Sequence, residues 1–455
     1  MLRRSFLQTA ALLPAAEAAR PNILLILADD LGWADTGPYG NRVIETPNLD
    51  RLAGESMRFT NAYSSAPICS PARAALLTGR SPARLHFEFV TKYADSKPTT
   101  VTPLRHPPFT LNLPLEEETI AEALGGAGYR TGIAGKWHLN AHHQQYLGYS
   151  PEYGPGRQGF DFAAEDRGSH PYSYKERTFD GCGDGVYPQD TLTKGATGFL
   201  RENRARPFFL FASHYYVHTP VHTRCRWLVE KYRNKYGGDA KRAMYAAFVE
   251  TFDHYVGQLL KEVDDPGLRR NTIVLFTSDN GGNPEVTSNA PLRGSKWNLY
   301  EGGVRVPMLV RWPGRVKAGS QCDVPVIGHD VFPTLCEIAG VARRGRLPLD
   351  GRSFARLLRA PRGRGWNRDA LHWHFPYYIP EHTATPDYRP QSSIRKGDWK
   401  LIYYYEDDRA ELFDLRADPG EQHDLAGSMQ PKARELVGDL KGYLRSVDAR
   451  LPVRR

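Results

Sequence analysis

The sequence contains no run of apolar residues long enough to cross a membrane. A membrane-spanning helix needs about 18 to 20 consecutive apolar residues, whereas the longest apolar runs here, such as residues 23–28, have the length of a β-strand. The chain nevertheless has 455 residues, of which 40% are hydrophobic. That is enough for a large core and a smaller appended domain. The sequence therefore predicts a globular protein without a membrane span.

Cysteine is scarce and widely spaced. The five cysteines form no C-x-x-C pair, so neither a zinc site nor a dense disulfide framework is expected; they are Cys69, Cys182, Cys225, Cys322 and Cys336. Motifs for nucleic-acid binding are also missing: there is no helix-turn-helix pattern, zinc-finger spacing or aromatic-basic motif. We therefore predict that the chain has no nucleic-acid partner.

Acidic residues are outnumbered by basic ones, which gives a formal net charge of +9. The excess is mostly arginine and is concentrated in residues 343–368, a stretch punctuated by Gly and Pro. Two interpretations are open. The stretch is either a solvated linker, or it produces a positive field that concentrates anionic substrates near the protein.

The first 20 residues differ from the rest of the chain. The run Arg3-Arg4-Ser5-Phe6-Leu7 resembles the twin-arginine export motif, and a short, weakly apolar stretch leads from it to Ala16-Glu17-Ala18. We predict that residues 1–19 are an export signal, the alternative being a disordered basic tail. The mature chain would then begin near Arg20 and be periplasmic or extracellular.

Short apolar, β-branched runs alternate with helical patterns along most of the chain. The runs are residues 23–28, 131–134, 208–211, 273–276 and 306–310, and helical spacing occurs within 46–57, 117–124 and 244–263. This alternation predicts an α/β fold with a large mixed, mostly parallel sheet and helices on both faces. Between them, residues 139–190 are rich in Gly, Tyr, His and Pro and predict a long irregular insertion that forms a pocket wall.

The composition changes near residue 360. Residues 392–394, 399–405 and 411–415 are typical of short antiparallel strands, and residues 431–447 of a final helix. We therefore divide the chain into a main domain, residues 20–359, and a small C-terminal α+β subdomain, residues 360–455. The aromatic residues within 371–378 predict part of a polar aromatic pocket.

Two polar pairs directly follow two of the predicted strands. Asp29-Asp30 comes after residues 23–28, and Asp279-Asn280 comes after residues 273–277. Ligands of such sheets bind beyond the carboxyl ends of the strands, so the four side chains can converge at one edge. Their oxygens suit calcium or magnesium. A single residue of this kind is ordinarily a cap or turn residue, but two pairs favour a metal site.

Cys69 begins the stretch Cys-Ser-Pro-Ala-Arg. Pro71 fits the first turn of a helix that continues to Leu77, so Cys69 lies at the helix N-terminus, where free N–H groups and the helix dipole favour an anion. Arg73 follows one turn later and can hold an oxyanion or an activated nucleophile. From these residues alone, Cys69 is either an activated nucleophile or a buried structural cysteine.

These residues resemble a known family. The run 69–73 followed by Leu77-Thr78-Gly79-Arg80 is similar to the C-x-P-x-R and T-G-R signature of the type I sulfatases, formylglycine-dependent enzymes of the alkaline phosphatase superfamily. The resemblance extends from about residue 21 to 425 without a departure at any motif position. The other matching segments are residues 22–32, 135–138, 218–220, 278–281, 294–296 and 301–303.

The resemblance implies a sulfuric ester hydrolase of the arylsulfatase or carbohydrate sulfatase kind, with residues 20–359 as its catalytic domain. It implies that Cys69 is oxidised to formylglycine by a formylglycine-generating enzyme, a transient partner. One calcium ion would be held by Asp29, Asp30, Asp279, Asn280 and the residue made from Cys69. Lys136 and Lys296 would hold sulfate oxygens, and Arg73 would stabilise the formylglycine. His138 would deprotonate its remaining hydroxyl, and His218 would protonate the leaving alcohol.

The substrate implied is a sulfated small molecule or glycan, and we expect a sulfated sugar. Two other functions stay open. One is a formylglycine-dependent phosphonate monoester or phosphodiester hydrolase. The other is a catalytically silent glycan-binding protein in which Cys69 is never converted.

Overall fold

A computed structural model of the chain describes residues 20–94, 101–174, 182–343, 345–379 and 385–455. The predicted export signal, residues 1–19, lies outside the described residues. Among the residues described, no helix is both long and apolar enough to cross a membrane.

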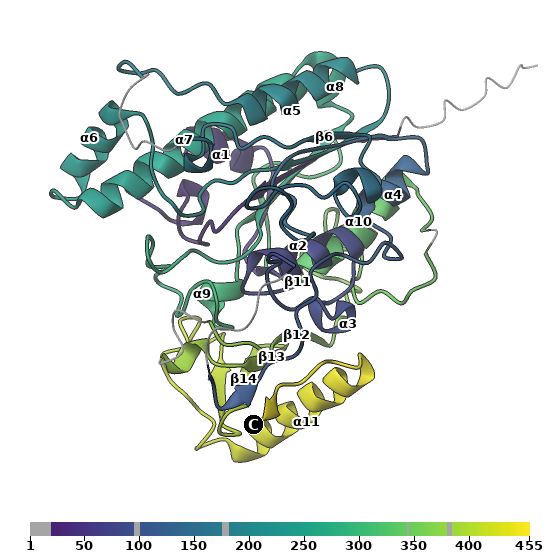
Figure 1. The fold of residues 1–455 in the computed structure, drawn as a ribbon, viewed down its shortest axis with the longest axis vertical. Helices are drawn as coiled ribbons and strands as arrows, with labels where there is room; N and C mark the ends of the chain where they lie inside the picture. The colour runs from purple at the N-terminus through teal and green to yellow at the C-terminus, as the bar shows by residue number, and fades with distance from the viewer. Residues whose placement is uncertain (1–19, 95–100, 175–181, 344, 380–384) are drawn as a thin grey trace, which may run out of the picture.

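A mixed sheet of eight strands forms the centre of the main domain (Figure 1). The strand order is β10-β2-β9-β8-β1-β7-β5-β6. Every pair is parallel except the two that involve β9, which runs antiparallel to β2 and β8. The mostly parallel α/β sheet predicted from the sequence is therefore confirmed. The strands are β1 (Asn22–Ala28), β2 (Met57–Phe59), β5 (Arg130–Gly135), β6 (Phe162–Ala164), β7 (Phe208–Ser213), β8 (Thr272–Ser278), β9 (Met308–Arg311) and β10 (Ser320–Cys322).

Helices cover both faces of this sheet (Figure 1). Strand β1 is buried along its whole length: Leu24 and Ile26 belong to one apolar core, and Ile23 and Leu25 belong to the other. A strand covered on both faces is apolar at every position, which explains this segment's sequence. The first core includes residues of α1 (Pro47–Gly54), α5 (Thr191–Glu202), α6 (Arg226–Lys235) and α7 (Ala240–Val263); the second includes residues of α2 (Cys69–Thr78), α4 (Ile120–Gly125) and α10 (Val331–Ala339).

Four neighbouring strands end level with one another. Leu27 of β1 is paired with Ser213 of β7, Ala28 of β1 with Ser278 of β8, and Ser213 in turn with Gly135 of β5. The residues that follow β1, β5, β7 and β8 consequently meet at one edge of the sheet, which is where α/β proteins place their ligands.

The C-terminal region forms a separate four-stranded antiparallel sheet. Its order is β12 (Ala370–Phe375), β13 (Gln391–Lys396), β14 (Trp399–Tyr404) and β15 (Ala410–Asp414). The long helix α11 (Gln430–Ser446) covers one face through Leu436 and Leu440, which share an apolar cluster with Ile394 and Leu401. The small antiparallel sheet and final helix predicted from the sequence are present, while the domain boundary near residue 359 stays a prediction.

The other face of this sheet is buried against the main domain. Trp373 and Phe375 of β12 are 1% and 0% exposed and share a cluster with Tyr63 and Leu299. The Trp373 indole donates a hydrogen bond to the Ser64 carbonyl over 2.8 Å. The prediction that this aromatic stretch lines a polar pocket is therefore wrong for Trp373 and Phe375. Strand alternation turns both towards main-domain residues that lie outside the eight-stranded sheet.

A buried ion cluster joins the two parts. Lys400 Nζ of β14 lies 2.8 Å from Glu301 Oε1 of α9 (Glu301–Val304) and 3.0 Å from Glu421 Oε1, and all three side chains are 0% exposed. The short helix α9 also contacts the strand edge, because the Gly281 N–H donates to the Gly303 carbonyl over 3.0 Å. The C-terminal sheet thus fixes a helix that packs beside the end of β8.

Several elements of the main domain were not predicted, among them β2, β10, α6, β6 and α5. Strand β6 adds an edge strand within residues 139–190, which the sequence predicts to be irregular; its three residues are only partly buried or exposed, so they lack a strong apolar pattern. Helix α5 contains two glycines and begins at Asp190, whose Oδ2 accepts from the Thr193 N–H over 2.8 Å. The remaining elements are short: β3 (Ala62–Tyr63), β4 (Leu104–Arg105), β11 (Val326–Ile327), β16 (Val453–Arg454), α3 (Pro82–Leu85) and α8 (Pro266–Arg269).

Candidate active site

The two polar pairs meet at the strand edge, as their positions in the sequence predict. Asp29 and Asp30 follow β1, Asp279 and Asn280 follow β8, and all four side chains are buried. The Asp30 N–H donates to Asp279 Oδ1 over 3.1 Å, and Asn280 Nδ2 donates to Asp30 Oδ1 over 2.7 Å. Asp30 has a φ of 62°, in the left-handed region that short polar residues tolerate, and this turns the chain directly after the strand.

Cys69 is the first residue of α2 and lies against the same carboxylates. Its Sγ is 3.4 Å from Asp29 Oδ1 and 3.9 Å from Asp30 Oδ1, and the residue is 1% exposed. Burial raises the pKa of the Cys69 thiol well above its ordinary value, and the charges of Lys136 and Lys296 offset only part of this. The unmodified residue is therefore a neutral thiol, which is a weak nucleophile.

Arg73, one helical turn after Cys69, is held by three partners. Its Nε donates to Asp279 Oδ2 over 2.8 Å, and its Nη1 donates to Ser213 Oγ over 2.6 Å and to the Lys136 carbonyl over 3.1 Å. Its Nη2 is buried without a hydrogen-bond partner. Because a guanidinium keeps its charge, Nη2 is a fixed donor for an anionic oxygen. Ser213 was not predicted, although it ends β7 and the strand-end rule could have found it.

Lys136 and Lys296 enter the site from two loops. Lys136 Nζ donates to Asp29 Oδ2 over 2.6 Å, and Lys296 Nζ donates to Asp30 Oδ2 over 2.7 Å. Burial alone would lower the pKa of each lysine, but the carboxylates outweigh it and raise both above the ordinary value. Both lysines are therefore permanent cations. Together with Arg73 they balance the three buried carboxylates of the site.

His138 is buried and has a φ of 58°. Its Nδ1 has no hydrogen-bond partner. Burial lowers the pKa of His138 well below its ordinary value, and the nearby Lys136 and His142 lower it further. His138 is consequently a neutral imidazole, which is the form that accepts a proton.

His218 lies on the other side of the carboxylates, with Nε2 3.7 Å from Asp30 Oδ2. Its Nδ1 is 2.5 Å from the Thr219 carbonyl and 3.1 Å from the Tyr172 hydroxyl. Because a carbonyl can only accept, Nδ1 carries the proton and Nε2 presents its lone pair. Burial, with a contribution from Lys296, lowers the pKa of His218 to about 3, so the residue is neutral at pH 7.

Two residues that support His218 were missed by sequence reasoning. The Tyr172 hydroxyl donates to the Thr219 carbonyl over 3.0 Å while it contacts His218, and His170 Nε2 is 2.9 Å from the His218 carbonyl oxygen. Both belong to the region predicted as a pocket wall. Its composition pointed to the region, but no spacing distinguishes Tyr172 or His170 from the other aromatic residues there.

The donor atoms fit a calcium ion. Asp29, Asp30, Cys69 and His218 each offer a ligand atom, and these atoms lie within 4.8 Å of one another. Asn280 Oδ1 is buried at the same edge without a hydrogen-bond partner, and a buried amide oxygen without a partner is costly unless a donor or cation supplies one. Carboxylate and amide oxygens are the ligands that calcium prefers. His218 was not predicted as a member of this group.

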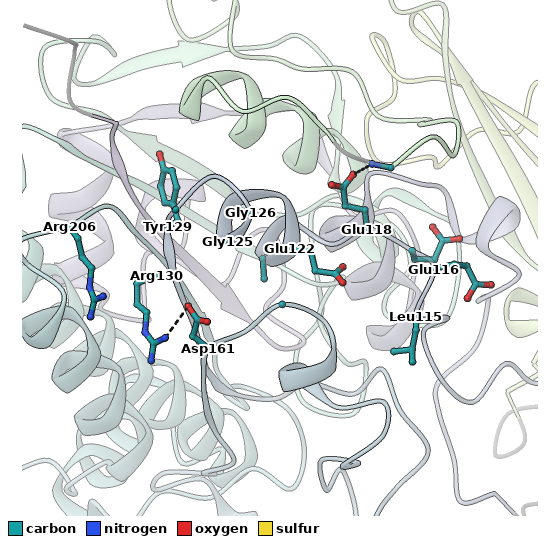
Figure 2. A pocket seen from close by; sticks show the side chains of 15 residues that line it. Leu115, Glu116, Glu118, Glu122, Gly125, Gly126, Tyr129, Arg130, Asp161 and Arg206 are labelled. Carbon is teal, nitrogen blue, oxygen red and sulfur yellow. Dashed lines mark hydrogen bonds and ion pairs between the residues drawn. The ribbon is translucent and has the colours of Figure 1, made fainter.

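A large open cavity lies elsewhere and has a different character. It has a volume of about 730 Å³ and is lined by Glu116, Glu118, Glu122, Tyr129 and Arg130, among others (Figure 2). Tyr129 and Arg130 stand at the amino end of β5, whereas the candidate site lies beyond the carboxyl ends of the strands. The cavity is therefore at the opposite edge of the sheet and does not belong to the active site.

The fold and the site together define a class of protein. Buried carboxylates that suit a hard cation, fixed positive side chains and a neutral histidine surround one helix-start residue. This is the inventory needed to hydrolyse an anionic ester with the help of a metal ion, because such a reaction develops charge on several oxygens at once.

Comparison with known proteins identifies the family within that class. The model of the sulfatase family matches residues 21–341, and the model of the C-terminal part of N-sulphoglucosamine sulphohydrolase matches residues 295–450. Arylsulfatase A of Bos taurus is 32% identical over 94% of this chain and 87% of its own length, and steryl-sulfatase of Mus musculus is 31% identical over 96% and 84%. The chain belongs to the sulfatase family, and it is an enzyme that hydrolyses sulfate esters.

Solved structures agree with this assignment. The crystal structure of Ps i-CgsB has a TM-score of 0.76, is 27% identical and covers 93% of each chain. The same protein in complex with k-i-k-neocarrahexaose has a TM-score of 0.75 and is 28% identical. The phosphonate monoester hydrolase of Agrobacterium radiobacter, 20% identical with a TM-score of 0.68, shares the fold.

Proposed function

We propose that this enzyme removes sulfate from a sulfated sugar, using a formylglycine made from Cys69 and one bound calcium ion. One observation carries the proposal: Cys69 Sγ lies between the carboxylates of Asp29 and Asp30, at 3.4 and 3.9 Å, in a site where Asn280 Oδ1 and Arg73 Nη2 are buried without hydrogen-bond partners. An oxygen-bearing group at position 69 and a cation beside it would supply partners for both.

Calcium would be held by Asp29, Asp30, Asp279 and Asn280, together with the residue made from Cys69. When bound, the ion supplies positive charge that lowers the pKa of an attached hydroxyl and offsets charge on the sulfate oxygens. Asn280 is already oriented for this role, because its Nδ2 donates to Asp30 and so directs Oδ1 away from that carboxylate.

A formylglycine hydrate supplies two hydroxyls on one carbon, one to attack sulfur and one whose deprotonation releases sulfate and restores the aldehyde. A thiol has no second hydroxyl, and the raised pKa of Cys69 makes the thiol itself a weak nucleophile. Around this group, Arg73 would donate Nη2 to an oxygen on residue 69, and His138, neutral in the protein, would take the proton of the second hydroxyl.

Lys136 and Lys296 would hold the sulfate oxygens as fixed cations. Proton transfer to the leaving alcohol is assigned to His218, and the structure adds a condition to that assignment. Since the pKa of His218 is about 3 in the protein and Nε2 carries no proton, the residue can act as an acid only once the negative charge of the bound ester raises its pKa.

Sugars are favoured as substrates by the relatives. Ps i-CgsB has been crystallised with k-i-k-neocarrahexaose, and N-acetylgalactosamine-6-sulfatase of Homo sapiens is 35% identical over 73% of this chain. The tyrosines and histidines beside His218 offer hydroxyl and imidazole groups that suit a polar, hydroxylated leaving group. We further propose that the enzyme is exported by its twin-arginine-like segment and meets a formylglycine-generating enzyme beforehand.

Mass analysis of the peptide that contains Cys69, taken from protein made in its own host, tests the central proposal. We expect the thiol to be replaced by an aldehyde, and calcium chelation to abolish turnover of an aryl sulfate reversibly. Persistence of the free thiol would overturn the formylglycine mechanism and leave a silent glycan-binding protein. A preference for an aryl phosphonate over the matching aryl sulfate would favour the phosphonate hydrolase alternative. Release of sulfate from a panel of sulfated mono- and oligosaccharides then identifies the sugar.

A further inference from the structure

One stretch that crosses the predicted boundary between the main domain and the C-terminal subdomain contains many arginines and no acidic residue. Residues 351–368 contain six arginines and neither Asp nor Glu. Five of the six are exposed, and we call these five the arginine surface: Arg352, Arg356, Arg359, Arg362 and Arg364. It is the larger part of residues 343–368, whose role the sequence left open between a solvated linker and a positive field.

Most of the arginine surface lacks an acidic partner. Within the described ranges, Arg356, Arg359, Arg362 and Arg364 form no ion pair, whereas other exposed arginines such as Arg201 pair with carboxylates. Of the acidic residues beside the stretch, Asp350 forms an ion pair with Arg84 over 2.9 Å, Asp330 pairs with Arg368, and the exposed Asp369 lies 4.0 Å from Lys396 Nζ. The charge of these four guanidinium groups is therefore available to a ligand.

The stretch is anchored to the domain and is not a free linker. Phe354, Leu357 and Leu358 are 0%, 1% and 3% exposed and belong to the second apolar core. Backbone hydrogen bonds form turns between them and beyond, for example from the Arg359 N–H to the Arg356 carbonyl over 3.1 Å. The arginines are thus presented from a fixed backbone, which lowers the entropy lost on binding.

The stretch also folds back on itself, which brings the Arg356 guanidinium against the backbone of residues 364–365. A Cβ atom at Gly365 would lie 2.7 Å from Arg356 Nη1, so that guanidinium packs on the backbone next to Arg364. Arg352 Nη1 donates to the carbonyl and to Oδ1 of Asn367, over 3.2 and 3.0 Å. Like charges gathered in this way repel one another, and a polyanion would relieve that repulsion.

This surface is separate from the active site. The stretch begins at the C-terminal end of α2, where the Asp350 N–H donates to the Gly79 carbonyl over 3.1 Å. Cys69 is at the other end of that helix. With a rise of about 1.5 Å per residue, the ten residues of α2 separate the two places by roughly 15 Å.

We propose that the arginine surface binds an extended sulfated polysaccharide and so holds a polymeric substrate at the enzyme while one of its sulfate groups occupies the site at Cys69. The proposal rests on the proposed sugar substrate and extends it to polymers. Guanidinium groups match sulfate oxygens in charge and bidentate geometry. Nucleic acid is the less favoured polyanion, because neither aromatic residue of the stretch offers an open face for stacking: Phe354 is fully buried, and Trp366 is half-buried under Arg368.

The test compares two quadruple variants that remove the same charge. The first changes Arg356, Arg359, Arg362 and Arg364 to Gln. The control changes four exposed arginines that have acidic partners, namely Arg51, Arg201, Arg204 and Arg242, to Gln. Binding to heparin and to dextran sulfate is measured at low and at moderate salt, and kcat/KM is measured on a sulfated polysaccharide and on an aryl sulfate.

We expect the first variant to bind heparin about tenfold to a hundredfold more weakly than the parent, with a weaker dependence on salt, and the control to change by less than about threefold. Its kcat/KM should fall on the polymer and stay within about twofold on the aryl sulfate, since no catalytic residue is altered. Equal losses in both variants would show a general charge effect and overturn the proposal. Double-stranded DNA competing as well as heparin would also overturn it, in favour of a nucleic-acid surface. Heparin binding requires no turnover, so its result is independent of whether Cys69 is converted.

Discussion

Replacing Lys400 by Met is the sharpest test of how the C-terminal sheet supports the catalytic domain. Lys400 is the single cation within 3.0 Å of both Glu301 and Glu421 in the described structure, and its side chain is 0% exposed. Met keeps the length and the apolar stem of the side chain but not the charge. The variant therefore leaves two buried carboxylates in one cluster, with Arg305 3.4 Å from Glu301 as the remaining ion pair.

The expected loss of stability follows from these contacts. Each charge-assisted hydrogen bond to a carboxylate contributes roughly 1.5 to 3 kcal/mol, but removing Lys400 also removes the cost of burying its charge. We therefore expect the free energy of unfolding to fall by about 3 to 5 kcal/mol, the usual result of breaking a buried ion pair. Burial raises the pKa of Glu421 to about 7, so this carboxylate can take up a proton in the variant. The loss should consequently be smaller at pH 6 than at pH 8.

Urea denaturation followed by tryptophan fluorescence measures this loss, because Trp373 lies 6.0 Å from Lys400 Nζ and reports on the same interface. The matched control is Lys432→Met on α11, which removes a lysine whose ion pair with Glu435 is partly exposed. Such a pair contributes about 1 kcal/mol or less. If the two variants lose the same stability, the cluster does not hold the sheets together and the reasoning fails.

Three further predictions concern other parts of the molecule. Burial raises the pKa of Glu421 from 4.5 to about 7, so between these pH values the native state keeps a proton that the unfolded state loses, and stability should fall as the pH rises from about 4.5 to 7. The urea midpoint of the parent should therefore fall more steeply with pH than that of Glu421→Gln. Equal dependence of the two midpoints on pH would contradict the assignment. Gly281→Ala places a Cβ atom 1.8 Å from the Gly302 carbonyl oxygen and should lower the melting temperature and the activity. Gly438→Ala, in the open middle of α11, should instead raise stability by about 0.5 to 1 kcal/mol. A Gly281→Ala enzyme that melts at the same temperature as the parent would show that the backbone at Gly281 and at Gly302 moves apart without cost. Tyr172→Phe removes a hydroxyl 3.1 Å from His218 Nδ1. It should lower kcat on an aryl sulfate about tenfold with little change in KM, and it should shift the pH–rate profile. A change in KM alone would assign Tyr172 to substrate binding instead.

The sequence predicted the positions of the ligand pairs because they obey a simple rule. Asp29, Asp30, Asp279 and Asn280 directly follow buried strands, and the register of β1 with β8 brings their ends level. The same rule would have located Ser213 at the end of β7. It could not place His218 beside Asp30, because His218 lies on a loop whose path depends on contacts with Tyr172 and His170 from a distant segment.

Other features depend on tertiary contacts that local patterns do not encode. The antiparallel direction of β9 within a mostly parallel sheet is set by how the chain returns to pair with β8. The aromatic residues of β12 suggested a sugar-binding pocket, yet Trp373 is buried because main-domain residues such as Tyr63 and Leu299 cover that face of the sheet. The Lys400 cluster joins Lys400 to Glu301, 99 positions earlier in the chain, and no sequence motif predicts this contact.

The burial of α2 has a consequence for how the active enzyme is made. All ten residues of this helix are buried, including Cys69 at its start. If Cys69 is converted to formylglycine as proposed, the oxidising enzyme would not reach it in the folded domain, so oxidation and folding would compete during synthesis. A chain that folded first would then keep the thiol, and adding the oxidising enzyme later should not rescue its activity. Slower folding, for instance at lower temperature, should then increase the proportion of each preparation that is active. The specific activity would therefore depend on the conditions under which the chain folded as well as on its sequence.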